Sequence, residues 1–162
     1  MASTYTPIAT TTLGSAAASY TFSSISGAYT DLILVINALN ASTDSVLMQV
    51  GNGSVDTGAN YSNTRLEGNG SAASSGRASN VTYCDIGYGN NNQALIVQLM
   101  NYSNTTSYKS VLNRYNDTAN VLGAKVNLWR STSAINTIKI YNYGGTNFGA
   151  GSTFTLYGIK AA

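Results

Sequence analysis

The chain has 162 residues, a formal net charge of +2 and charged side chains at only 9% of its positions. This length suits a single domain with a sizeable core, and the 12 tyrosines and regular apolar runs exclude a disordered chain. The cationic residues are scattered rather than clustered, so nucleic-acid binding is not expected.

The first segment, residues 1–13, alternates loosely between apolar residues and threonines and contains the only proline, Pro7. Proline in a sheet belongs at an edge or at the start of a strand, so this segment is predicted to be an N-terminal arm or an edge strand. Residues 14–162 are expected to form one β-sandwich domain. The N-terminus lacks a charged region followed by an apolar core, and we expect neither a signal peptide nor a transmembrane segment.

The most continuously apolar run is Leu32–Ile36, five aliphatic residues rich in β-branched types. Because alternation disappears when neither face meets water, this run predicts a strand that is covered on both faces. A buried helix segment is the alternative. The next apolar run, Val46–Val50, follows closely and is predicted to be its hairpin partner.

The segment Gly68–Asn80 is composed almost entirely of Gly, Ser, Ala and Asn. It is predicted to be an exposed loop, either a passive connection or, given its length, an interaction site.

From Asn80 onward short runs of strand-forming residues alternate with turn signals, and one of these strands is expected to bend at Gly123. This spacing predicts an all-β protein, an antiparallel β-sandwich of jelly-roll type, and no segment has sustained helical periodicity. The expected core residues are apolar members of these strands: Leu32, Leu34, Ile36, Leu47, Leu95, Val97, Leu99, Leu128, Ile138, Ile140 and Leu156.

Residues suited to catalysis are scarce. The chain has no histidine, which removes the commonest general base and the commonest metal ligand, and Cys84 alone cannot form a zinc site. Cys84 is predicted to be a small strand residue. A glycosidase pair would require Asp56 and Glu67 to converge across a cleft, and solvated loop acids are the alternative interpretation. We expect no enzyme activity, no cofactor and no metal.

Tyrosine is the one residue type whose excess suggests a function. The tyrosines can be good strand formers, residues of a subunit interface, or residues that stack on a sugar. The loop Gly144–Gly151 is, with the N-terminal segment, a candidate contact region. The candidate interface residues are Tyr5, Ile8, Arg77, Tyr141, Tyr143 and Phe148.

Several short segments resemble a pattern found in small virion proteins of tailed bacteriophages. They are Gly51-Asn52-Gly53, Asn60-Tyr61-Ser62 with Leu66, Gly68-Asn69-Gly70-Ser71, the ending from Trp129 to Ile138, Asn147-Phe148, and Gly151 to Ile159. The sequence departs from that pattern at Val35-Ile36-Asn37 and at Gly53-Ser54, where the family has Gly-Asp. The resemblance brings no catalytic residue with it.

The resemblance implies a structural protein of a phage particle. We expect a capsid decoration (cement) protein, made in the bacterial cytoplasm, that binds the major capsid protein on the capsid exterior as a homotrimer, with no membrane partner. A tail or fibre domain that binds a receptor or glycan is the alternative. The absence of a coiled-coil or collagen-like shaft favours the compact decoration protein.

Overall fold

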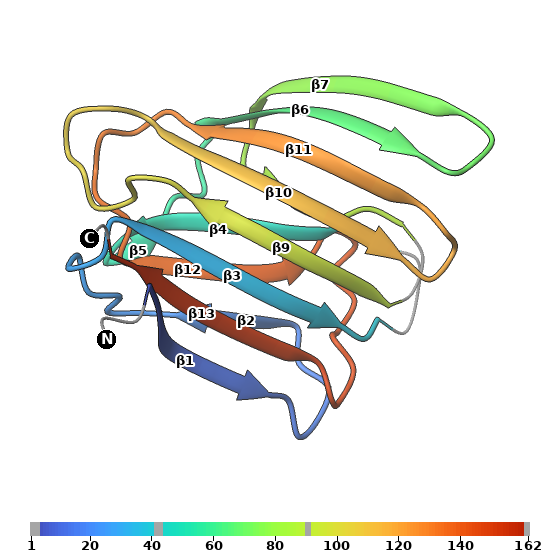
Figure 1. Cartoon of the computed structure of the whole chain (residues 1–162), viewed down its shortest axis with the longest axis horizontal. Coiled ribbons are helices and arrows are strands. Elements are labelled where there is room, and N and C mark those ends of the chain that lie inside the picture. The colour runs from blue at the N-terminus through green and yellow to red at the C-terminus, as the bar shows by residue number, and fades with distance from the viewer. Residues whose placement is uncertain (1–3, 41–43, 90–91, 161–162) are drawn as a thin grey trace.

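The structure, a computed structural model, describes residues 4–40, 44–89 and 92–160. Two antiparallel β-sheets lie face to face, and these ranges contain no helix (Figure 1). A helix able to cross a membrane is accordingly not found in them. The expected all-β antiparallel sandwich is confirmed, in an arrangement compatible with the jelly-roll type.

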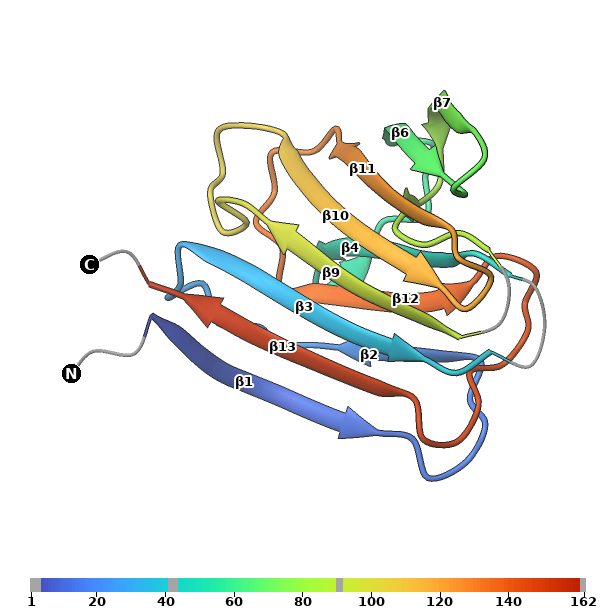
Figure 2. The same cartoon turned by 45° about the vertical axis from the view of Figure 1, so that its right-hand side comes forward.

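The larger sheet has eight strands among the described residues, in the order β1-β13-β3-β9-β10-β11-β6-β7. Figure 2 shows how the first six run side by side across the front of the molecule. The bounds of its strands are β1 (Tyr5–Thr12), β3 (Asp31–Ala38), β6 (Tyr61–Gly68), β7 (Ala73–Val81), β9 (Gln93–Leu99), β10 (Lys109–Asp117), β11 (Leu122–Trp129) and β13 (Thr153–Ile159).

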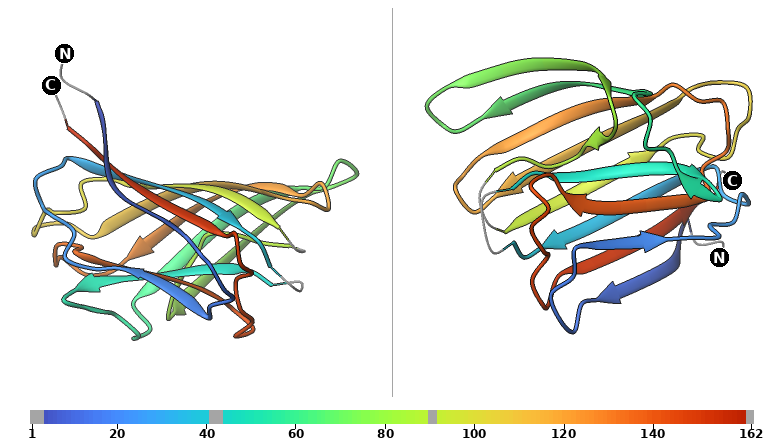
Figure 3. Two further views of the ribbon diagram at one scale, coloured as in Figure 1. Left: turned by 90° about the horizontal axis from the view of Figure 1, so that it is seen from below. Right: turned by 180° about the vertical axis from the view of Figure 1, so that it is seen from behind.

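The smaller sheet packs against the back of the larger one as seen in Figure 1, and it lies toward the viewer in Figure 3, right. Its strand order is β2-β12-β4-β5, with β8 also pairing with β4. Its strands are β2 (Ser19–Phe22), β4 (Val46–Asn52), β5 (Ser54–Val55), β8 (Cys84–Asp85) and β12 (Thr137–Asn142).

The core lies between the two sheets. Leu32, Leu34 and Ile36 of β3 contribute to it from the larger sheet, and Met48 and Val50 of β4 from the smaller one, all essentially inaccessible to solvent. Each such side chain stabilises the fold by about 1.5–3 kcal/mol relative to an exposed one, which makes the facing of β3 and β4 the centre of the fold.

The predicted hairpin between Leu32–Ile36 and Val46–Val50 is wrong. β3 pairs with β13 and β9, whereas β4 pairs with β12 in the opposite sheet. The chain therefore changes sheet between Ala38 and Val46. The prediction that β3 is covered on both faces is also wrong, because Val35 is 39% exposed.

The prediction of a loop over Gly68–Asn80 is wrong for most of this segment. Residues 73–81 form β7, which pairs with β6 through a turn that contains Gly70 at φ +82°. The sequence shows no strand pattern because β7 is largely exposed on both faces. This hairpin projects beyond the smaller sheet (Figure 3, right).

Three smaller differences concern single residues. Residues 5–12 form the edge strand β1 on β13, with Pro7 beside a register shift that tolerates its missing N–H. Gly123 does not bend β11, which keeps its register with both neighbours. Leu128 is only half-buried, because the inward positions of β11 belong to Asn127 and Trp129.

Candidate functional site

The outer face of the larger sheet is apolar and is not covered by any described element. We use the term outer face for the outward-pointing residues of β3, β9, β10, β11, β6 and β7. Its most exposed large residues are Leu122 (65%), Leu66 (62%), Val126 (49%), Ile96 (41%) and Val35 (39%). A contiguous exposed apolar patch of this kind is typical of an interaction surface rather than of an ordinary monomer surface.

The strand β11 has an inverted pattern of polarity. Its inward positions include the buried polar residues Lys125 and Asn127. Its outward positions carry Leu122, Ala124 and Val126 instead. Ordinary strands of a sandwich place apolar residues inward and polar residues outward. The inversion brings a row of aliphatic side chains of β11 to the surface, so the apolar character of the outer face does not depend on a single residue.

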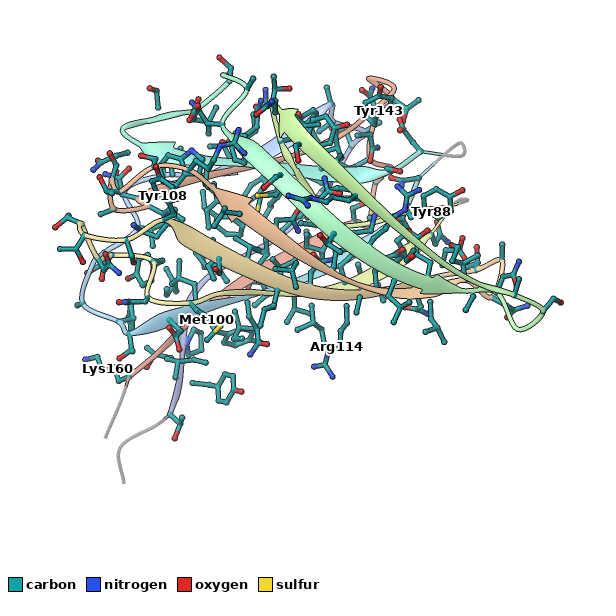
Figure 4. The ribbon with its side chains drawn as sticks, turned by 90° about the horizontal axis from the view of Figure 1, so that it is seen from above. Tyr88, Met100, Tyr108, Arg114, Tyr143 and Lys160 are labelled. Carbon is teal, nitrogen blue, oxygen red and sulfur yellow. The ribbon has the colours of Figure 1, made fainter. Side chains whose placement is uncertain are left out.

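Arg114 lies in the middle of this surface. The register places Ile96, Arg114, Ala124 and Leu66 side by side on four adjacent strands. These residues line a shallow groove of ≈ 570 Å³. In Figure 4 the side chain of Arg114 points away from the ribbon into solvent. The site is therefore an aliphatic surface with the guanidinium group of Arg114 at its centre.

The charges of the outer face have no partner within the described chain. Neither Arg114 nor Arg77, which lies on β7 beside Thr64, forms an ion pair with a described residue. All six carboxylates of the chain are already engaged by donors or cations inside the molecule: Asp31, Asp44, Asp56, Glu67, Asp85 and Asp117. None of these six side chains pairs with Arg114, so Arg114 has no acidic partner among the described residues.

A second, smaller site lies at one end of the sandwich. Tyr88 and Tyr143 are 45% and 65% exposed and border a cavity of ≈ 230 Å³ together with Asp44 and Asp117. Asp44 accepts hydrogen bonds from the Gly144 N–H and the Thr146 hydroxyl, which holds the rim of the cavity in place. Figure 4 shows both tyrosines at the same end of the molecule. Two exposed aromatic rings beside polar groups suit the stacking of a sugar.

The candidate residues from the sequence do not converge on one site. Tyr5 is 54% exposed on β1, where it packs edge-on against Tyr157, and Ile8 is half-buried against the core. Tyr141 is half-buried on β12, in the other sheet, and burial raises its pKa to about 12. Of the six candidate residues, Arg77 lies on the outer face, and Tyr143 borders the cavity that it shares with Tyr88, which we call the tyrosine cavity.

Phe148 is completely buried, which the sequence did not indicate. Its ring packs edge-on against Phe154, and its backbone pairs with Ala17 and Asn40. It therefore belongs to the core and has no surface to offer a partner.

The remaining candidate catalytic and metal-binding residues form contacts within the protein. Cys84 is buried, and burial raises the pKa of its thiol. Asp56 accepts a hydrogen bond from the Trp129 indole, whereas Glu67 lies against Tyr115 and Arg65, so each has its own structural partners. In the part of the chain that the structure describes, no three His, Cys, Asp or Glu side chains gather where they could hold a metal ion.

Sequence reasoning missed Arg114 and the outer face. The signal was present in the alternation of β11, which is typical of an ordinary amphipathic strand until the side that faces the core is known. The sequence matches no protein-family model, and no curated protein is significantly similar to it.

Proposed function

We propose that this protein is a structural component of a phage particle, a capsid decoration protein that binds the coat protein on the exterior of the head and catalyses no reaction. The resemblance of its turn and C-terminal segments supports the class of protein. The observation that carries the binding role is the uncovered outer face, with Arg114 at its centre.

The chemistry of the outer face defines the partner surface. Leu66, Ile96 and Val126 require an apolar counterpart, and Arg114 requires a carboxylate inside it. A second copy of this chain is a poor occupant, because its acids are already engaged and its own Arg114 would repel the first. We therefore assign this face to the coat protein, with an acidic side chain opposite Arg114.

Contacts between copies belong elsewhere. Tyr5 and Tyr143 are exposed aromatic residues outside the outer face, and aromatic residues are enriched at subunit interfaces. A homotrimer would engage three equivalent positions around a three-fold point of the shell together, which raises avidity without strong individual contacts. Sedimentation of the purified protein tests this state: a trimer that Tyr5→Ser or Tyr143→Ser weakens supports it, and a stable monomer contradicts it.

Binding to purified shells that lack the protein tests the coat-protein role. Arg114→Glu should weaken binding about tenfold or more, because it places like charges in contact. Lys160→Glu is the matched control, since it reverses an exposed charge away from the outer face and should bind as the parent protein does. Added salt should have little effect, because few exposed ion pairs are involved. Equal binding by Arg114→Glu, or location of the protein only on tails, would contradict the proposal.

A second candidate function is supported by the tyrosine cavity alone. A tail or fibre domain that recognises a glycan would use Tyr88 and Tyr143 as stacking platforms beside the rim that Asp44 fixes. A glycan-array signal that disappears in Tyr88→Ala and Tyr143→Ala, while shell binding is absent, would favour this function over decoration.

A further inference from the structure

A lysine and an aspartate are buried in contact between the two sheets. Lys125 of β11 belongs to the larger sheet, and Asp85 of β8 is attached to the smaller sheet through β4. Lys125 Nζ lies 2.7 Å from Asp85 Oδ1, with the two side chains 0% and 14% exposed. The pair is therefore a direct link between the sheets, in a region with little access to water.

The geometry around the amine differs from that of a simple ion pair. Nζ donates a hydrogen bond to the Gly87 carbonyl at 3.0 Å and lies 3.7 Å from Glu67 Oε1. Asp85 Oδ1 accepts no well-aligned hydrogen bond despite its closeness to Nζ. Since a carboxyl C–O bond is about 1.2–1.3 Å long, the carboxyl carbon of Asp85 lies within about 4 Å of Nζ, close to the distance of a near-attack arrangement.

The surroundings favour the uncharged forms of both groups. Burial lowers the pKa of Lys125 and raises the pKa of Asp85, although each group opposes the shift of the other. A neutral amine is a nucleophile, and a neutral carboxylic acid is a far better acyl acceptor than a carboxylate. The rings of Tyr88 and Tyr115 flank the amine, with their centroids 5.8 and 4.8 Å from Nζ.

Glu67 is placed to move protons between the reacting groups. Its Oε1 lies 3.7 Å from Lys125 Nζ and 2.5 Å from the Tyr115 hydroxyl, and Arg65 Nε holds its other oxygen at 3.4 Å. Three contacts fix the orientation of this carboxylate beside the amine. It can accept a proton from the attacking nitrogen and return it to the departing oxygen.

We propose that Lys125 and Asp85 form an intramolecular isopeptide bond. Lys125 Nζ attacks the Asp85 carboxyl carbon, a new N–C bond forms, and one C–O bond breaks. The departing oxygen leaves as water, which carries one proton from the amine and one from the carboxylic acid. A neutral amine and a neutral carboxylic acid thus give one amide and one water, with no oxidant, reductant or other reactant. The bond would join the two sheets covalently, and it does not depend on what the outer face binds.

Intact mass under denaturing conditions tests the bond. The purified protein should be lighter than its sequence predicts by the mass of one water molecule. Asp85→Ala and Lys125→Arg should each have the full mass of their sequences. After proteolysis, a branched peptide should connect the segment around Cys84–Ile86 with the segment around Lys125. Glu67→Gln should show a mixture of linked and unlinked protein, or slower conversion after refolding.

The control variant is Lys139→Arg, which changes a half-buried lysine of β12 that lies over Tyr141. It should retain the loss of one water. The measurement on the parent protein does not depend on any variant folding. Full sequence mass together with separate peptides for β8 and β11 would overturn the proposal and leave an ordinary buried ion pair.

Discussion

The hydroxyl of Tyr115 lies 2.5 Å from Glu67 Oε1, although the strand β11 runs between the two residues. The register places Gly123 directly between them, opposite Tyr115 on one side and Glu67 on the other. Because Gly123 has no side chain, the ring of Tyr115 crosses β11 and reaches the carboxylate beyond it. The glycine thus makes room for a buried hydrogen bond and does not mark a bend.

Gly123→Ala should destabilise the protein. An added Cβ would lie 2.4 Å from the Tyr115 hydroxyl oxygen and 2.5 Å from its Cζ, too close for any side chain. Overpacking of this kind typically costs about 1–3 kcal/mol, and here the displaced ring also loses its contact with Glu67. Urea unfolding of parent and variant measures the difference.

Gly14→Ala is the matched control for this change. No atom lies within 4 Å of a Cβ at Gly14, and its φ is not positive, so its free energy of unfolding should stay within about 0.5 kcal/mol of the parent. Equal stability of the two variants would show that Tyr115 can leave the space above Gly123 without cost.

Leu34→Asp should prevent folding. Leu34 is inaccessible to solvent in the centre of the core, and an unpaired buried carboxylate costs at least about 4 kcal/mol. Val35→Asp changes the next residue of the same strand to the same side chain, but on the 39% exposed outer face. It should cost about 1 kcal/mol or less. Circular dichroism and soluble yield distinguish the two. Folded Leu34→Asp would remove β3 from the core.

The core residues of β3, β9 and β12 were predictable, because a run such as Leu32–Ile36 has few alternatives to a buried strand. The partner of each strand was not. Nothing in Val46–Val50 distinguishes a hairpin neighbour from a strand of the facing sheet, since both bury the same aliphatic groups. That choice is made by long-range packing over the whole sandwich.

The strand β7 and the outer face were missed for opposite reasons. β7 is composed of small residues because neither face is covered, so it lacks the apolar pattern that identifies a strand. β11 has a clear pattern, but its polarity is inverted, with Lys125 inside and Val126 outside. Alternation alone specifies two faces and cannot tell which one meets the core.

Tyr61→Phe should destabilise the fold without changing its packing. The Tyr61 hydroxyl accepts a hydrogen bond from the Val50 N–H and lies within hydrogen-bond distance of the Val50 and Asp56 carbonyl oxygens. Its loss removes the partner of the buried Val50 N–H of β4, which costs about 1–3 kcal/mol, whereas the Val50 carbonyl still accepts a hydrogen bond from the Asp56 N–H.

Tyr5→Phe is the comparison for this change, because the Tyr5 side chain is 54% exposed and water can replace its contacts. It should leave the free energy of unfolding within about 0.5 kcal/mol of the parent. If Tyr61→Phe unfolds at the same urea concentration as Tyr5→Phe, the hydroxyl does not support the sandwich.

The stability of the sandwich should fall at alkaline pH, in part through Tyr141. Burial raises the pKa of this phenol from 10.0 to about 12, so the folded state favours its neutral form. A group with a raised folded-state pKa contributes its full stabilisation below pH 10.0 and loses it as the pH rises to about 12. Tyr141→Phe removes the titrating hydroxyl and keeps the ring, so the variant should lose less stability than the parent over that interval. Urea midpoints at a series of pH values measure both proteins, and parallel loss in the two would show that Tyr141 titrates without coupling to folding.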